Sequence, residues 1–318
     1  MSKDARIVFM GTADFAVPSL EALVKSGHQI VAVVTMPDKP IGRGHKLRPS
    51  NVKLKALELG IEVLQPIKLS APEFIDKLQS LHVDLGIVVA FRMLPKEVWS
   101  LPKMGTINLH SSLLPQFRGA APINRAIMCG EKETGVSCFV LKHEIDMGDV
   151  LQQKSTLIGK DENAGELHDR LMMIGADLLV DTVDKYLAGD IVAKPQSDFE
   201  NSTNLKPAPK IFKEDCKIDW SQTRSQLHNF VRGLSPYPLA WSDLKILASD
   251  MQTYKIFEID PNVEDVQIPD GLGVGECFTV RNKQLFVICQ DGAVRLLRLQ
   301  APGKKPMKDI DLLNGMRN

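Results

Sequence analysis

Short runs of apolar residues alternate with amphipathic segments through the first 190 residues of this 318-residue chain. Strands that alternate with helices indicate βαβ units and a parallel sheet, and nearly continuous apolar strands indicate a sheet covered on both faces. We therefore expect an α/β fold with a Rossmann-like, mostly parallel sheet. The pattern predicts strands at 6–10, 29–35, 62–64, 83–90, 105–109, 135–141 and 150–158, and helices at 17–26, 51–59 and 72–80.

The pattern changes after about residue 190, and a proline-rich, linker-like stretch follows at 206–210. Short strands separated by turns are typical of a small β-barrel or sandwich. We expect a first domain at 1–190, a linker at 191–208 and a small β-barrel domain at 209–318. The segments behind this expectation are a helix at 221–233 and strands at 240–248, 254–259, 275–281, 284–289 and 293–299.

Composition narrows the class of protein. Lysine plus arginine equals aspartate plus glutamate at 39 each, which argues against a protein that coats nucleic acid but allows one local basic patch. No apolar run approaches the roughly 18–20 residues of a membrane span. Five scattered cysteines without a CxxC pair favour a reducing cytoplasm, and each is interpreted as a small core residue. We expect a cytoplasmic monomer without a membrane partner.

The turn Gly11-Thr12 follows the first strand, where a dinucleotide-binding loop would lie. Only one glycine of the G-x-G-x-x-G fingerprint is present, and the second strand ends at Val34-Thr35 without an acidic residue. An NAD-dependent oxidoreductase is therefore disfavoured. A tight turn that lines the ligand crevice is the favoured interpretation.

A polar pair ends one of the apolar strands. Alternation places Asn108 and His110 on the same side of the strand, at the carboxyl edge where open α/β sheets bind ligands. Asp146 adds a carboxylate from the turn 143–149, which is either a functional group or part of a solvated hairpin turn.

An amide, an imidazole and a carboxylate suit acyl transfer to an amine. Asn108 and His110 can donate hydrogen bonds to the oxyanion of a tetrahedral intermediate. Asp146 can orient the histidine and relay the proton of the attacking amine. The sequence shows no activated serine or cysteine, so direct transfer without an acyl-enzyme is the simpler hypothesis.

An ordered set of motifs carries a resemblance to the folate-dependent formyltransferase family: 108–115, Arg118-Gly119-Ala120-Ala121-Pro122, Gly135-Val136-Ser137 and 145–149. The resemblance covers the chain from Arg6 to about Asn314. It implies 10-formyltetrahydrofolate as the formyl donor, no metal, and Asn108, His110 and Asp146 as the catalytic residues. It also implies folate contacts, held largely by backbone groups, at Val89, Ala90, Phe91, Arg92, Met93, Leu94, Ser112, Leu113, Leu114, Pro115, Ile145 and Asp146.

The chain departs from the family where the family usually has Tyr-Gly. It has Phe91-Arg92 there. Loss of the glycine either narrows a backbone turn or places the arginine near the glutamate tail of the folate.

Two features of the chain resemble those of one branch of the family. Members of this branch formylate the α-amino group of methionine on initiator methionyl-tRNA for translation initiation. The first is the loop 36–47, which overlaps the stretch 39–55. That stretch holds six basic residues and no acid. Such a stretch is either a solvated surface or suited to the phosphates of an acceptor end. The second is the C-terminal domain, which is similar to an OB-like tRNA-binding domain. The residues expected at the tRNA are Lys39, Arg43, His45, Lys46, Arg48, Lys304 and Lys305.

Other substrates and functions remain open. A formyltransferase acting on the amine of a nucleotide sugar or of glycinamide ribonucleotide would share the three catalytic residues. It is expected to lack the loop and the second-domain markers. A non-catalytic RNA-binding module would not need Asn108, His110 and Asp146 together.

Overall fold

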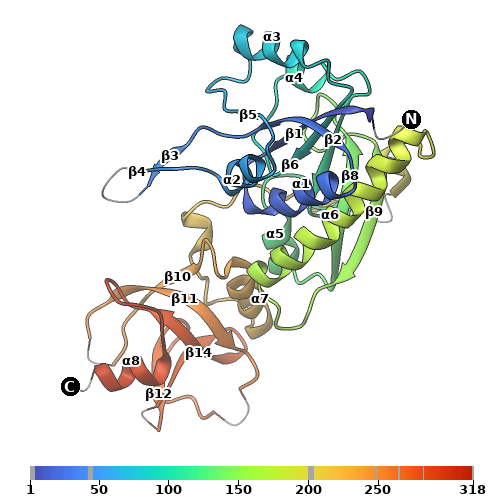
Figure 1. The fold of residues 1–318 in the computed structure, drawn as a ribbon. Coiled ribbons are helices and arrows are strands. Elements are labelled where there is room, and N and C mark those ends of the chain that lie inside the picture. The colour runs from blue at the N-terminus through green and yellow to red at the C-terminus, as the bar shows by residue number, and fades with distance from the viewer. Residues whose placement is uncertain are drawn as a thin grey trace. The chain divides into compact units, whose positions relative to one another are not determined.

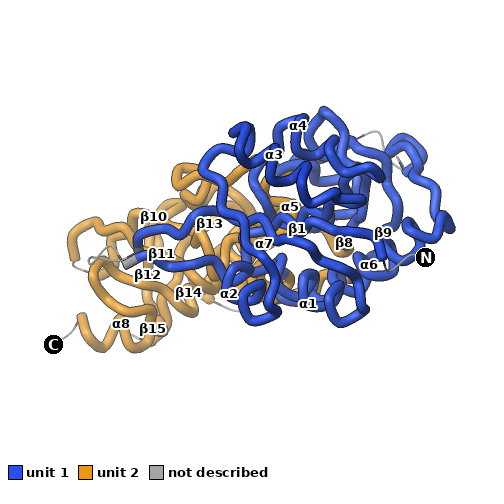
Figure 2. The backbone as a smooth tube through the Cα atoms, turned by 45° about the horizontal axis from the view of Figure 1, so that its top comes forward, with its two compact units in different colours: residues 1–119, 134–156, 168–207 blue, residues 120–133, 157–167, 208–318 orange. Residues whose placement is uncertain are grey.

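The computed structural model describes residues 4–41, 46–199, 204–247, 249–263, 266–281 and 283–316, in two compact units. Figure 2 shows unit 1 in blue and unit 2 in orange. Both units are assembled from segments that are separate in the sequence. The domain boundaries and the linker expected from the sequence stay a prediction. Unit 1 comprises 1–119, 134–156 and 168–207, and unit 2 comprises 120–133, 157–167 and 208–318.

Unit 1 is built on a sheet of seven described strands in the order β5-β2-β1-β6-β7-β8-β9 (Figure 1). The pairs β1–β2, β1–β6, β2–β5 and β6–β7 are parallel, and β7–β8 is antiparallel. The predicted mostly parallel sheet is therefore confirmed. The strands are β1 (Arg6–Gly11), β2 (Gln29–Val34), β5 (Val63–Leu64), β6 (Leu85–Val89), β7 (Thr106–His110), β8 (Glu133–Val140) and β9 (Val150–Leu157).

Helices cover both faces of this sheet, as its nearly continuous apolar strands predict. On one face, Val8 and Met10 pack with Phe74 and Leu78 of α3 (Pro72–Ser80). On the opposite face, Gly175 of the long helix α6 (Ala164–Ala188) lies so close to Leu109 that a β-carbon there would crowd the leucine. The other helices are α1 (Val17–Lys25), α2 (Asn51–Glu58) and α4 (Lys96–Trp99), and β3 (Lys39–Ile41) and β4 (Lys46–Arg48) form a separate antiparallel hairpin.

Helix α6 (Ala164–Ala188) is absent from the elements predicted from the sequence. A capping box nevertheless marks its start. Asn163 Oδ1 accepts hydrogen bonds from the backbone N–H groups of Gly165 and Glu166, and the Glu166 carboxylate accepts one from the Asn163 N–H at 2.9 Å. Among the helices that the structure describes, none combines the length and apolar character that crossing a membrane requires.

Unit 2 contains an antiparallel sheet in the order β10-β11-β14-β13-β12, with β15 beside β14. Leu227 and Val231 of α7 pack with Ile256 and Val294 of the sheet in one buried cluster. The predicted small β domain is therefore confirmed, and its strands are antiparallel. Within the described residues its two end strands, β10 and β12, are not paired with each other. The elements are α5 (Pro122–Met128), α7 (Arg224–Leu234), β10 (Ala240–Leu244), β11 (Gln252–Asp260), β12 (Cys277–Val280), β13 (Gln284–Cys289), β14 (Gly292–Gln300), β15 (Met307–Lys308) and α8 (Asp309–Gly315).

The cysteines differ in exposure. Cys138, Cys216 and Cys289 are buried and Cys277 is half-buried, but Cys129 is exposed at the end of α5. The interpretation of every cysteine as a core residue is therefore wrong for Cys129.

We expect thiol chemistry to report this difference. Complete burial raises the pKa of the Cys138 thiol to about 12, so almost none of the reactive thiolate forms there at pH 8. A disulfide reagent at pH 8 should label Cys129 rapidly and Cys138 only after denaturation. Cys129→Ser should abolish the fast phase, and a fast phase that survives this substitution would contradict the structure.

Candidate active site

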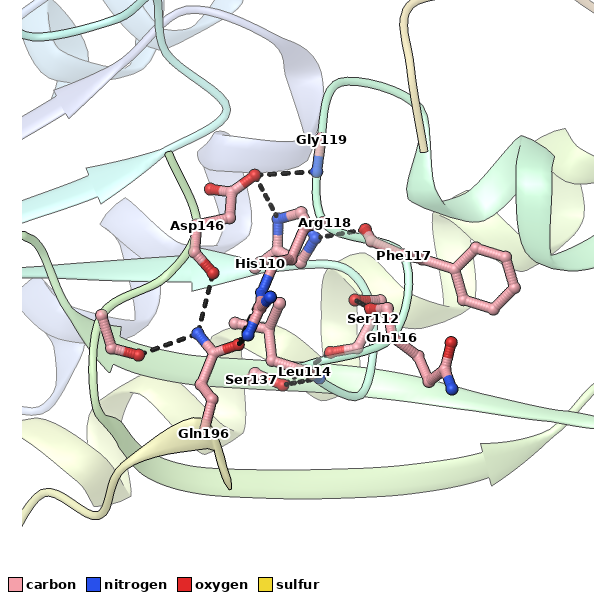
Figure 3. Close-up of polar contacts among 11 residues, drawn as sticks. His110, Ser112, Leu114, Gln116, Phe117, Arg118, Gly119, Ser137, Asp146 and Gln196 are labelled. Carbon is pink, nitrogen blue, oxygen red and sulfur yellow. Dashed lines mark hydrogen bonds and ion pairs between the residues drawn. The ribbon is translucent and has the colours of Figure 1, made fainter. Parts of the chain in front are cut away.

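His110 ends β7 and is buried. Its Nε2 lies 2.9 Å from the carbonyl oxygen of Phe117, and because a carbonyl oxygen only accepts hydrogen bonds, we assign a proton to Nε2. Nδ1 is then the nitrogen on the side of Asp146, 3.9 Å from its Oδ2 (Figure 3). This separation permits an ion pair but is longer than a hydrogen bond. The Phe117 carbonyl is therefore the hydrogen-bonding partner that orients the ring.

Asp146 is held by backbone groups and by one amide. Its Oδ2 accepts a hydrogen bond from the Gly119 N–H at 2.9 Å, and its own carbonyl oxygen accepts one from Gln196 Nε2 at 2.7 Å (Figure 3). Its φ is +53°, a left-handed conformation that costs a non-glycine residue about 1 kcal/mol or more. Aspartate is one of the residues that tolerate this region, and the surrounding hydrogen bonds stabilise it here.

Gln196 is buried in the 3-10 turn Gln196–Phe199. Its Nε2 also donates to the Gly148 carbonyl at 2.8 Å, and its Oε1 accepts from Arg118 Nε and Nη2 at 2.8 and 2.6 Å. A side chain at Gly148 would overlap the Val140 carbonyl, so the chain can turn here only with glycine. In the sequence Gln196 falls within the expected linker, and no local signal marks it, because its partners lie far away along the chain.

Ser137 of β8 supports the loop that follows His110. Its hydroxyl donates to the Ser112 carbonyl at 2.6 Å and accepts from the Leu114 N–H at 3.1 Å. Gln153 Nε2 donates both to this hydroxyl and to the Leu114 carbonyl, at 2.8 and 2.7 Å. The serine of the Gly135-Val136-Ser137 motif thus fixes the backbone of the loop that carries Phe117.

Asn108 lies two residues before His110 on β7 and is partly exposed. In the described part of the chain its side chain has no hydrogen-bond partner, so its amide is available to a ligand. The structure thus brings His110 and Asp146 together and places Asn108 on the same strand. Over the same described residues, no three histidine, cysteine, aspartate or glutamate side chains form a cluster that could hold a metal ion.

The segments expected at the folate expose apolar side chains and bury others. Met93 and Ile145 are 73% and 60% exposed, whereas Ser112 and Leu114 are buried. Ala90 has a φ of +46°, which marks a tight turn directly after Val89 at the end of β6.

Arg92 is engaged by the backbone. Its Nη1 donates to the carbonyl of Ile67 at 2.9 Å and its Nη2 to that of Pro66 at 2.5 Å. The guanidinium therefore ties the loop after β6 to the segment after β5. The sequence alone predicts only a narrowed turn or a contact with the folate tail.

The residues expected at the tRNA are described only in part. Lys39 and Arg48 are exposed and lie opposite each other in the β3–β4 hairpin. Lys46 pairs with Ile41 through the backbone, and Arg43 and His45 lie outside the described residues. Lys304 and Lys305 are exposed between β14 and β15 of unit 2.

Two cations of the basic stretch 39–55 are neutralised by acids. Lys53 Nζ lies 2.7 Å from Asp38 Oδ2, and Lys55 Nζ lies 2.6 and 2.8 Å from carboxylate oxygens of Glu21 and Glu58. The run of six basic residues is therefore not a uniform positive surface.

The chain belongs to the formyl transferase family: residues 5–183 match the family described as formyl transferase, and residues 210–317 match the formyl transferase C-terminal domain. It is 50% identical over 313 residues to a methionyl-tRNA formyltransferase of Porphyromonas gingivalis, covering 98% of this chain and 96% of that protein. It is 49% identical over 315 residues to a methionyl-tRNA formyltransferase of Bacteroides fragilis, covering 98% and 95%.

Solved structures share the fold at low sequence identity. HypX from Aquifex aeolicus, in complex with tetrahydrofolic acid, aligns with a TM-score of 0.63 at 18% identity, over 97% of this chain and 46% of that one. The N-formyltransferase from Helicobacter canadensis, in complex with folinic acid and dTDP-3-aminofucose, aligns with a TM-score of 0.62 at 18% identity, over 93% and 99%.

We expect Gln196→Leu to disturb the site by freeing two carbonyls and one guanidinium. Buried polar groups left without partners destabilise a protein by about 1–3 kcal/mol. Urea denaturation should show this loss, whereas Gln79→Leu, on the exposed surface of α3, should stay within about 0.5 kcal/mol of the unchanged protein. Equal midpoints for the two variants would contradict the bridging role of Gln196.

Proposed function

We propose that this chain transfers the formyl group of 10-formyltetrahydrofolate to the α-amino group of methionine on initiator methionyl-tRNA, the step that prepares this tRNA for translation initiation. The identity of 50% over 98% of the chain with a protein of that activity carries the proposal. The pairing of His110 with Asp146 at the end of a central strand supports it chemically.

The chemistry is a direct acyl transfer. The amine nitrogen forms a bond to the formyl carbon, and the oxyanion formed in between needs hydrogen-bond donors. The carbon–nitrogen bond to the folate then breaks, and the folate nitrogen leaves with the proton that the amine has given up. The unpartnered Asn108 amide supplies one donor. In its imidazolium form His110 supplies another from Nδ1, because Nε2 is already committed to the Phe117 carbonyl.

Asp146 is the group suited to accept the proton of the attacking amine. One of its carboxylate oxygens is held by the Gly119 N–H, and the hydrogen bonds of Gln196 fix its backbone. A base held in this way is already oriented when the substrate arrives, which is the condition for efficient proton transfer.

For the folate we propose the turn at 89–94 and the loops around 112–115 and 145–146. The exposed side chains of Met93 and Ile145 suit an aromatic ring system. For the tRNA we propose Lys39, Arg43, His45, Lys46, Arg48, Lys304 and Lys305. We further propose that the protein acts as a monomer in the cytoplasm, which sedimentation and cell fractionation test.

An assay with purified protein, formyl-folate and three acceptors tests the function. Methionyl initiator tRNA should be formylated, whereas an amino-sugar nucleotide and glycinamide ribonucleotide should not. Formylation of either small acceptor, with none of the tRNA, would overturn the proposal in favour of a different branch of the family.

We expect Asn108→Ala and His110→Ala each to lower kcat by about 10²–10³-fold, the cost of removing one oxyanion donor. Single-turnover rates at saturating folate and tRNA measure the loss, and thermal unfolding confirms that each variant folds. A variant that folds and turns over at nearly the original rate would exclude that residue from catalysis.

We expect the combined variant Lys39→Ala/Arg48→Ala to weaken tRNA binding and to flatten its dependence on salt. Removing one cation that binds a phosphate should reduce the slope of log affinity against log salt by roughly 0.9. The KM for formyl-folate should not change. Lys96→Ala, an exposed cation on α4, is the control, and an unchanged slope in the double variant would argue against phosphate binding by the hairpin.

A further inference from the structure

Three polar side chains from three segments meet at the base of the β3–β4 hairpin. Lys53 Nζ donates to Asp38 Oδ2 at 2.7 Å and to Gln65 Oε1 at 2.8 Å. Gln65 Nε2 donates to Asp38 Oδ1 and to the Met36 carbonyl, both at 2.8 Å. The three side chains therefore form a closed ring, here called the hairpin latch.

The latch fixes the hairpin to the carboxyl edge of the sheet. Asp38 directly precedes β3, Lys53 lies on α2, and Gln65 directly follows β5. The segment after Gln65 is itself held, since its next two carbonyls accept the hydrogen bonds of Arg92. The hydrogen bonds from Lys53, and then from Gln65, lower the pKa of the Asp38 carboxyl, so the ring stays charged at neutral pH.

The hairpin needs such an anchor. Each of its strands has three residues, and an isolated two-stranded hairpin is at best marginally stable in water. It also presents Lys39 and Arg48 opposite each other, a like-charge pair that is unfavourable unless an anion binds between them. In the described ranges neither cation forms an ion pair with an acidic side chain.

We propose that Asp38, Lys53 and Gln65 are positioning residues that hold the β3–β4 hairpin at the angle at which its exposed cations meet the phosphates of the tRNA acceptor end. The latch residues themselves contact no substrate. This inference rests on the proposed function, because it assumes that the hairpin engages tRNA.

The neighbouring helix residue Lys55 is a matched control. Its exposed side-chain fraction is 21%, the same as that of Lys53, and it too has two partners. Its partners, Glu21 and Glu58, belong to α1 and α2, so none of its ion pairs reaches the hairpin.

The first test compares Lys53→Met with Lys55→Met in the full-length protein. Lys53→Met should lower kcat/KM for methionyl-tRNA by about ten- to a hundred-fold, since displaced binding groups lose productive geometry. Its KM for formyl-folate should stay unchanged. Lys55→Met should behave like the unchanged protein in both measurements. Equal kinetics for the two variants would overturn the proposal.

The salt dependence separates positioning from direct contact. A latch residue contacts no phosphate, so Lys53→Met should keep the slope of log KM against log salt, whereas Arg48→Ala should reduce it by roughly 0.9. A reduced slope in Lys53→Met would mean that Lys53 itself binds the tRNA, and the positioning role would be wrong.

Asp38→Asn gives a second, independent decision. It breaks the latch but adds one net positive charge, so simple attraction to tRNA predicts a lower KM and a positioning role predicts a higher one. If Lys53→Met does not fold, Asp38→Asn alone tests whether the hairpin latch positions the hairpin. If the unchanged protein fails to formylate methionyl-tRNA, the proposed function fails; if it succeeds and Asp38→Asn does not raise KM, only the latch fails.

Discussion

The candidate site depends on the side-chain amide of Gln196, which links the backbone turn 146–148 to the side chain of Arg118. Gln196 binds the carbonyls on either side of Met147 and also accepts from the Arg118 guanidinium. These hydrogen bonds stabilise the left-handed conformation of Asp146. Without them the segment 143–149 would be an ordinary solvated turn, the alternative that the sequence leaves open. A buried amide therefore helps to hold the residue that we propose as the base.

The partners of the two ionisable residues are backbone groups of a single loop. The Phe117 carbonyl accepts from His110, and the Gly119 N–H donates to Asp146. Phe117 and Gly119 both have positive φ, at +57° and +125°. This conformation turns the Phe117 carbonyl toward His110 and the Gly119 N–H toward Asp146 within three residues. The backbone of this loop, and not its side chains, supplies these two contacts.

Local sequence patterns predict the helices, the strands and the ends of the strands, because burial of one face imposes a regular spacing of apolar residues on each segment. The predicted helix 72–80 coincides with α3, and the position of Asn108 and His110 follows from where an apolar strand stops. Polar pairings between distant segments leave no such trace. Gln196 is one example, and the pairing of Lys53 with Asp38 is another. Helix α6 is a different case. Its Asn163–Glu166 capping pattern is visible in the sequence, but a prediction based on the spacing of apolar residues does not use it.

The basic stretch 39–55 shows why charge in a sequence differs from charge on a surface. Lys53 and Lys55 stabilise the fold through acids, and their fields are largely cancelled within a few ångströms. Lys39 and Arg48 keep their charge unpaired in the described structure and face each other across a short hairpin. An anion bound between them would relieve their repulsion, so a protein of zero net charge can attract phosphate at one place without attracting nucleic acid everywhere. The hairpin latch adds no unpaired charge of its own. Its role is to set the orientation of the hairpin, and therefore the direction in which Lys39 and Arg48 extend.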